Sequence, residues 1–321
     1  MTSQITQMMQ NMIKETINQL EQNGGLKISV EEAFALFEME APKKVSKGVK
    51  AAPTKDCKPK MTTFLLKHIL NDPIVCEVFL RSLPKNRILQ EVIEYAHSVC
   101  PGLKEFVEDN KHGFNSSKKQ DKGNLGKIVE FYLFGQLPNC DPNPDLAWGA
   151  DIKATHFKTN KHGHFNAKER LTITNCGKTA DYTSFSSIQE ATDLKSCKFY
   201  PKIQNGVLFV FAHTAGKYDD MEANLQKRLL AVSTYNTDEL PDEFQAQLQT
   251  DFQDIQQKIT DQEVSQKGQK YLHIHPHGSK NSTTRAFGFT NKFLTKLVAY
   301  TNNLPCTHKG RSVYIEKQHF Q

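Results

Sequence analysis

Two carboxylates and a lysine stand close together near the middle of the chain, at Asp145, Asp151 and Lys153. Residues two apart on a β-strand share a face, so Asp151 and Lys153 are predicted to point the same way and the apolar residues around them into a core. Asp145 precedes this strand, and Gly149 between them permits a sharp bend. The three charged groups are therefore expected to converge on one spot.

This combination of side chains suits the hydrolysis of a phosphodiester. Carboxylate oxygens are the ligands that Mg²⁺ prefers, and the ion polarises the phosphate while keeping some of its waters. A lysine beside it can orient the attacking water and stabilise the charge that develops on the phosphate. The same short pattern also occurs on charged surface strands. The surrounding sequence must therefore distinguish a nuclease site from an ordinary surface strand.

The elements that must position these residues change character along the chain. Residues 61–110 are predicted to form helices separated at Pro73, Pro84 and Pro101, and another helix begins near Asn124. Four short runs then indicate strands, at residues 149–157, 170–175, 206–213 and 270–275. Apolar residues at 244, 248, 252, 255 and 259 predict a long helix before the last of these strands, and a strand-turn-helix follows at 283–301. The pattern predicts an α/β fold, a central mixed sheet flanked by helices.

Two segments in front of this body differ from it. Residues 1–41 are predicted to be a helical extension. Residues 42–60 contain seven Lys and one Asp, which accounts for the whole net charge of +6 that results from 41 basic and 35 acidic residues. This Lys-rich linker is either a solvated spacer or a flexible tether to nucleic acid, because clustered lysines displace counterions from phosphates.

Composition excludes several classes of protein. The 321 residues are 38% hydrophobic and include 20 Phe, which argues against wholesale disorder. The chain shows neither a membrane-length apolar run nor a signal-peptide pattern, so no membrane partner is expected. Seven scattered Cys without a C-x-x-C pair indicate reduced thiols. The expected location is the cytoplasm, associated with the nucleoid of a prokaryotic host.

Residues 122–133, K-G-N-L-G-K-I-V-E-F-Y-L, resemble the K-G-x-x-G-x-x-x-E-x-x-L helix of the MutH-type endonucleases. This family of PD-(D/E)xK nucleases comprises the mismatch-repair nickase MutH and related type II restriction enzymes that cut at GATC. Further matches follow in the family's order: D…G-A-D-I-K at 145–153, Y-P-K at 200–202 before an apolar strand, and segments 268–277 and 285–293. The resemblance extends over residues 120–300 and implies a restriction-endonuclease-like core in a domain at 61–321.

The resemblance also implies roles, position by position. The catalytic residues would be Glu130, Asp145, Asp151, Lys153 and Lys202. The metal would be Mg²⁺, with Mn²⁺ able to substitute, bound by Asp145, Asp151, the carbonyl of Ile152 and Glu130. The DNA-binding residues would be Lys122, His275, His277 and Arg285.

Three departures from the family pattern limit this transfer. Asp151 replaces the usual Glu, His275 and His277 replace a base-reading Arg and Lys, and Gly288 falls where an aromatic residue often stands. Because Arg is the commonest specific contact to guanine, GATC remains only the best guess for the site. The H-x-H pattern also leaves open a zinc site on this strand.

The expected function is that of a Mg²⁺-dependent, site-specific endonuclease on double-stranded DNA, of the type II restriction class. The alternatives are a mismatch-repair-type nicking endonuclease and a catalytically inactive DNA-binding module. A restriction enzyme of this kind would act as a homodimer on DNA, with a cognate DNA methyltransferase encoded nearby.

Overall fold

The computed structural model describes residues 66–67, 69–112, 114, 123–137, 143–177, 184–214, 220–263, 267–276, 284–310 and 312–320. The predicted helical extension at 1–41 and the Lys-rich linker at 42–60 lie outside the described residues. Lys122 and His277 lie outside them as well, so their DNA-binding roles remain predictions.

Helices precede the first strand, as the sequence predicts. They are α4 (Pro73–Ser82), α5 (Leu89–Val99), α6 (Pro101–Asn110) and α7 (Asn124–Phe134). Pro73 and Pro101 begin helices rather than merely separating them, because proline fits the first helical turn, where no N–H donor is needed. Asp72 caps α4 by accepting hydrogen bonds from the main-chain N–H groups of Ile74 and Val75, at 2.8 and 3.1 Å.

The remaining elements alternate strands and helices. They are β1 (Ala150–Thr159), β2 (Phe165–Ala167), β3 (Leu171–Cys176), α8 (Phe185–Glu190), α9 (Pro201–Gln204), β4 (Asn205–Ala212), α10 (Met221–Leu225), β5 (Leu229–Asn236), η1 (Thr237–Glu239), α11 (Asp242–Thr260), β6 (Leu272–Pro276), β7 (Arg285–Phe289), α12 (Asn291–Thr301), β8 (Cys306–Lys309), β9 (Ser312–Ile315) and η2 (Lys317–Phe320). The predicted α/β class is confirmed.

A mixed six-stranded sheet forms the centre, in the order β5-β4-β1-β2-β9-β8. Residues 150–157 of β1 pair in parallel with 205–212 of β4, whereas β5 runs antiparallel to β4. β2 pairs with β1 only at residues 157–159 of β1. The first half of β1 therefore has β4 on one side and, within the described residues, no strand on the other.

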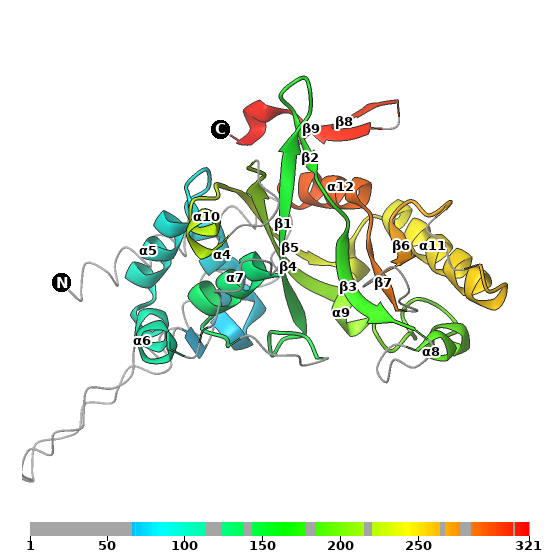
Figure 1. Cartoon of the computed structure of the whole chain (residues 1–321), viewed down its shortest axis with the longest axis horizontal. Helices are drawn as coiled ribbons and strands as arrows, with labels where there is room; N and C mark the ends of the chain where they lie inside the picture. The colour runs from blue at the N-terminus through cyan, green and yellow to red at the C-terminus, as the bar shows by residue number, and fades with distance from the viewer. Residues whose placement is uncertain are drawn as a thin grey trace, which may run out of the picture.

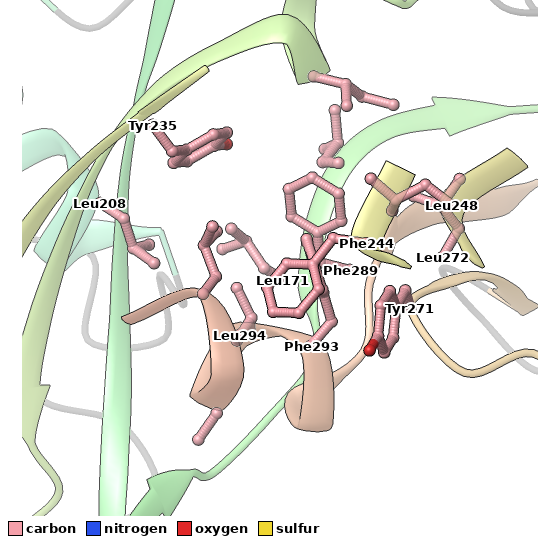
Figure 2. Packing of buried hydrophobic residues seen from close by; sticks show 14 of the residues in the cluster. Leu171, Leu208, Tyr235, Phe244, Leu248, Tyr271, Leu272, Phe289, Phe293 and Leu294 are labelled. Atoms are coloured by element: carbon pink, nitrogen blue, oxygen red, sulfur yellow. The ribbon is translucent and has the colours of Figure 1, made fainter. Parts of the chain in front are cut away.

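Helices cover both faces of the sheet (Figure 1). One hydrophobic core joins α4–α7 to the face that carries Ile152, Val207 and Phe209. The other core joins α8, α9, α11 and α12 to the opposite face, and Figure 2 shows its centre, where Tyr235, Phe244 and Phe289 pack with their neighbours. Because β4 is buried on both faces, its sequence is a nearly continuous apolar run.

β5 is not among the strands predicted from the sequence. It begins with Leu229-Leu-Ala, an apolar run that does not alternate, and alternation appears only over its second half. The short strands β2, β8 and β9 were not predicted either, and each contains four residues or fewer. The predicted long helix is α11, and its buried face includes all five predicted apolar positions.

A second sheet, β3-β7-β6, lies beside the first. Gly288 of β7 pairs with Thr172 on one side and His273 on the other. A Cβ atom at Gly288 would lie 2.0 Å from the main-chain oxygen of Leu171, so no side chain fits there. This close approach of two strands is the physical reason why glycine stands at position 288.

Among the helices that the structure describes, none is both long enough and apolar enough to cross a membrane.

We expect Gly288→Ala to lower the free energy of unfolding by about 3 kcal/mol, because the new methyl group overlaps main-chain atoms that cannot move aside cheaply. Gly126→Ala is the matched control: its Cβ would lie 3.9 Å from Glu130 Oε1, and alanine favours a helix over glycine by up to ~1 kcal/mol. Urea unfolding measures both. Equal midpoints for Gly288→Ala and the parent would contradict this account.

Candidate active site

The main chain of Ile152 presents its polar groups at the open edge of β1. Its N–H donates a hydrogen bond of 2.7 Å to Asp145 Oδ2, and Lys153 Nζ donates one of 3.2 Å to its carbonyl oxygen. A turn in which the Gly149 N–H bonds to Leu146 O, with φ of +89° at Gly149, brings Asp145 back to this edge. Asp145 thus occupies the place of a missing neighbouring strand.

Asp151 lies next to this hydrogen bond and is 1% exposed. Lys153 Nζ forms an ion pair with Asp151 Oδ2, since the two side chains share a face of β1 as predicted. Apart from this ion pair, neither carboxylate oxygen of Asp151 accepts a hydrogen bond of ordinary geometry from the described residues. Burying a carboxylate is costly, and a bound cation would stabilise it further.

Asp145 and Asp151 oppose each other's charge. Burial raises the pKa of Asp145, and repulsion from Asp151 raises it further, to about 7. Lys153 and the Ile152 N–H act in the opposite direction but do not compensate fully. Two carboxylates that repel each other at the edge of a strand form a set of oxygen donors that a divalent cation would relieve.

Glu130 reaches the same place from α7. Its Oε1 lies 3.9 Å from the position of a Cβ at Gly126, one turn earlier, so the side chain bends back along the helix. Burial raises the pKa of Glu130, Lys153 lowers it and Asp151 raises it, which places all three charges within electrostatic reach. The other face of α7 packs Ile128, Val129 and Phe131 into the core, and this fixes the helix against β1.

Lys202 is carried by α9, which contacts β1, β4 and β3. Its charge also lowers the pKa of Glu130. Of the five residues predicted to be catalytic, Asp145, Asp151 and Lys153 meet at the start of β1. Glu130 lies within electrostatic reach of Asp151 and Lys153, and Lys202 within electrostatic reach of Glu130.

A cleft of about 280 Å³ opens beside this cluster. Glu130, Ile152 and Lys153 line it, whereas Asp151 is buried behind Lys153. Glu169 and Arg170, in the connection between β2 and β3, form another part of its wall. These two residues were not predicted, because only the path of the chain over the open edge of β1 brings them to the cleft.

Tyr235 was also missed, although the sequence holds a signal for it. Asp151 pairs with Gly206 on β4, and Gly206 pairs with Tyr235 on β5, so the three positions form one row across the sheet. A Cβ at Gly206 would lie 2.4 Å from Tyr235 Oη, which shows that the tyrosine ring covers this glycine. Burial and the charge of Asp151 both raise the pKa of Tyr235. An isolated glycine inside a strand is the signal for such a close approach.

The predicted DNA-reading residues lie on the second sheet, apart from the catalytic cluster. His275 Nδ1 is 3.1 Å from Nδ1 of the buried His273 on β6. Burial lowers the pKa of His273 to about 3, and the positive charges of His275 and Arg170 act in the same direction. Arg285 of β7 donates a hydrogen bond of 3.2 Å to the carbonyl of Thr284. His273 is therefore a neutral core residue. His275 is partly exposed, and its DNA-reading role remains a prediction.

The donor groups can be tested against a metal ion. No group of three or more His, Cys, Asp or Glu side chains in the described part of the chain forms a ligand set. The H-x-H pair therefore finds no third zinc ligand there, and Glu130 does not join Asp145 and Asp151 in a set of three carboxylates. Mg²⁺ needs less from the protein, since it commonly binds through one or two carboxylates and keeps several waters. The Asp145 and Asp151 carboxylates and the Ile152 carbonyl fit that requirement.

Comparison with known proteins relates part of the chain to a restriction enzyme. No family model matches the chain. A segment of 58 residues, 18% of this chain, is 41% identical to the type II restriction enzyme Sau3AI of Staphylococcus aureus. The segment spans 12% of the length of that enzyme. This partial similarity supports a restriction-endonuclease-like family, and the mixed sheet flanked by helices is compatible with such a core.

In metal-free buffer, Asp145→Asn should stabilise the protein at pH 8 and have little effect near pH 4. The carboxyl titrates near 7 when folded but near 4 when unfolded, so its ionisation costs folding free energy increasingly between these values and fully above 7. The gain should be roughly 1–3 kcal/mol, since one pKa unit corresponds to about 1.4 kcal/mol and partial exposure screens the effect.

Urea midpoints measured with EDTA at pH 4, 6 and 8 give this comparison. Adding Mg²⁺ at pH 8 should reverse the order, because an ion that binds only the folded parent stabilises it. A difference between variant and parent that does not change with pH would refute the electrostatic argument.

Proposed function

We propose that this chain is a Mg²⁺-dependent, site-specific endonuclease acting on double-stranded DNA, of the type II restriction class and of MutH-like type. The observation that carries the proposal is the meeting of Asp145, Asp151 and Lys153 at the open edge of β1, beside Glu130 and a cleft. The partial similarity to a type II restriction enzyme supports DNA as the substrate.

Asp145, Asp151 and the carbonyl of Ile152 would hold the metal ion, and Glu130 would complete the site or hold a second ion. Mg²⁺, or Mn²⁺ in its place, neutralises phosphate oxygens and acidifies water when it is bound. Lys153 now neutralises Asp151. If a bound ion neutralised Asp151 in its place, the Lys153 ammonium group could donate hydrogen bonds to the attacking water and to the phosphate.

Cationic side chains around the cleft would hold the phosphate in line for attack. Lys202 lies within electrostatic reach of Glu130, and Arg170 forms part of the cleft wall. An arginine can donate two parallel hydrogen bonds to a phosphate, which fixes its orientation as well as its charge. The water would release one proton to solvent as it adds to phosphorus, the ester P–O bond would break, and the departing oxygen would take up one proton from solvent.

Each chain supplies one such cluster, so each hydrolyses one strand at a time. Cutting both strands requires two protomers on the DNA or two successive visits, and a homodimer on DNA is the proposed state. A repair-type nicking endonuclease would use the same chemistry, but the similarity to a restriction enzyme favours restriction. A methyltransferase encoded beside the gene would protect the host's own sites.

A catalytically inactive DNA-binding module is the alternative from another class. Such a protein has no use for a buried carboxylate balanced by a lysine, which costs folding energy. The convergence of Glu130, Asp145 and Lys153 therefore favours an active enzyme.

Plasmid DNA incubated with the full chain and Mg²⁺ should be cut into discrete fragments, and EDTA should abolish the cutting. Asp145→Ala and Lys153→Ala should each lower the rate by at least about a hundredfold, the usual cost of losing one positioned charged group, while DNA binding largely survives. Lys309→Ala, on the exposed β8 hairpin, is the control and should retain the parental rate. Parental rates for either site variant would disprove the proposed active site.

Sequencing the ends of the fragments tests the choice of site, for which GATC is the best guess. We expect His275→Ala to relax discrimination between the cognate site and its single-base variants by about ten- to a hundredfold, the worth of one good base contact. His308→Ala, an exposed histidine on β8, should leave the ends unchanged. Discrete ends at another sequence would preserve the chemistry and reject GATC, and unchanged ends in His275→Ala would reject the reading role.

A further inference from the structure

Lys202 is carried by a helix too short to hold its own shape. α9 contains four residues, and its main-chain hydrogen bonds run from Ile203 and Gln204 to the carbonyl of Tyr200, at 2.8 and 2.9 Å. A single helical turn is unstable in isolation, because fixing the backbone costs more than one or two hydrogen bonds return. The direction of the Lys202 side chain must therefore be set from outside the helix.

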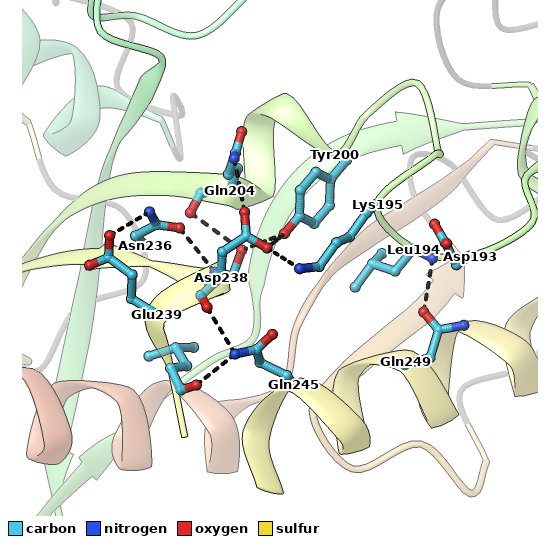
Figure 3. Close-up of polar contacts among 12 residues, drawn as sticks. Asp193, Leu194, Lys195, Tyr200, Gln204, Asn236, Asp238, Glu239, Gln245 and Gln249 are labelled. Atoms are coloured by element: carbon cyan, nitrogen blue, oxygen red, sulfur yellow. Dashed lines mark hydrogen bonds and ion pairs between the residues drawn. The ribbon is translucent and has the colours of Figure 1, made fainter. Parts of the chain in front are cut away.

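Asp238 of η1 contacts both ends of this turn (Figure 3). Tyr200 Oη donates a hydrogen bond of 2.7 Å to its Oδ1, and Gln204 Nε2 donates one of 2.9 Å to its Oδ2. Residues four apart lie on one side of a helix, whereas a residue two positions from each lies near the opposite side. Asp238 therefore holds one side of α9, and Lys202 lies near the opposite side of this turn, which contacts β1. The charge of Lys202 lies within electrostatic reach of Glu130.

Asp238 is itself well fixed. Its main-chain N–H donates 2.9 Å to Asn236 Oδ1, and its carbonyl accepts 2.9 Å from Gln245 Nε2 of α11. Burial opposes the charged form, but donors from Lys195, Tyr200 and Gln204 outweigh it and hold the pKa of the carboxyl below its ordinary value. The carboxylate is thus ionised at neutral pH, and a charged acceptor makes stronger hydrogen bonds than a neutral one.

We infer that Asp238 is a positioning residue: by binding Tyr200 and Gln204 it fixes the rotation of α9 and with it the direction of the Lys202 side chain. The inference rests on the proposed nuclease function. The hydrogen bonds of Asp238 to Tyr200 and Gln204 connect it to Lys202 through α9.

A double-mutant cycle in the full chain tests this role, with turnover at saturating DNA as the readout. We expect Lys202→Ala and Asp238→Ala each to lower the rate by about ten- to a hundredfold, the cost of a misplaced group in an active site. The double variant should be no slower than Lys202→Ala within about threefold, because two residues that act through one group are not additive. DNA affinity should change little in Asp238→Ala.

The controls use neighbours of the same network. Lys195 Nζ lies 2.5 Å from Asp238 Oδ1 but its side chain is 59% exposed, so Lys195→Ala should cost little. Gln249→Ala removes a hydrogen bond to Leu194 N, beside the network, and should keep the parental rate. If Asp238→Ala melts below the assay temperature, Tyr200→Phe, which deletes a single hydroxyl, replaces it in the cycle.

Three results would overturn the inference. The first is a parental rate for Asp238→Ala or, where it is used, for Tyr200→Phe. The second is a double variant whose loss equals the product of the single losses, which indicates a general structural effect. The third is a parental rate for Lys202→Ala, in which case there is no group to position. Asp145→Ala in the same assay separates these results from a failure of the nuclease proposal itself.

Discussion

The hydrogen bond from the Ile152 N–H to Asp145 determines the geometry on which the proposed chemistry depends. A strand edge needs partners for its main-chain groups, and here a carboxylate supplies one of them. The same contact brings Asp145 against Asp151, in an environment where both charges are poorly solvated. By pairing with the main chain of β1, Asp145 thus places its negative charge beside that of Asp151. In the proposed enzyme, a bound cation would recover part of the free energy that burying these charges costs.

The sheet carries this arrangement between two separate hydrophobic cores. β1 and β4 contribute apolar residues to both of them, so neither core can form without these strands. The charged cluster lies at the first half of β1, where within the described residues no strand pairs with β1 on the side away from β4. Tyr235 closes the space over Gly206 in the same row as Asp151, and its burial keeps water from that side. Asp151 consequently lies against a rigid apolar support, and Glu130 is the acidic residue of the cluster that lines the cleft.

Much of this could be predicted from the sequence. Local periodicity was sufficient for α7, β1, β4 and α11, because each has a regular apolar pattern or a continuous apolar run. The two-residue spacing of Asp151 and Lys153 was sufficient to predict that their side chains share a face of β1. Arg170, Tyr235 and Asp238 could not be found in this way, since each acts through a residue that is distant along the chain. The H-x-H pattern of β6 left open a zinc site, whereas His273 is buried against the neighbouring strand and His275 is partly exposed.

Gly288 limits how the surface of the second sheet can vary. Recognition surfaces usually diversify by exchanging side chains on a fixed backbone, and residues on adjacent strands are the natural places for such exchange. At Gly288 the carbonyl of Leu171 occupies the volume that any side chain would need. Gly288 therefore cannot be replaced by a residue with a side chain unless β3 shifts. Under the proposed role of this sheet in reading DNA, variation would concentrate on the partly exposed ends of β6 and β7, at His275 and Arg285.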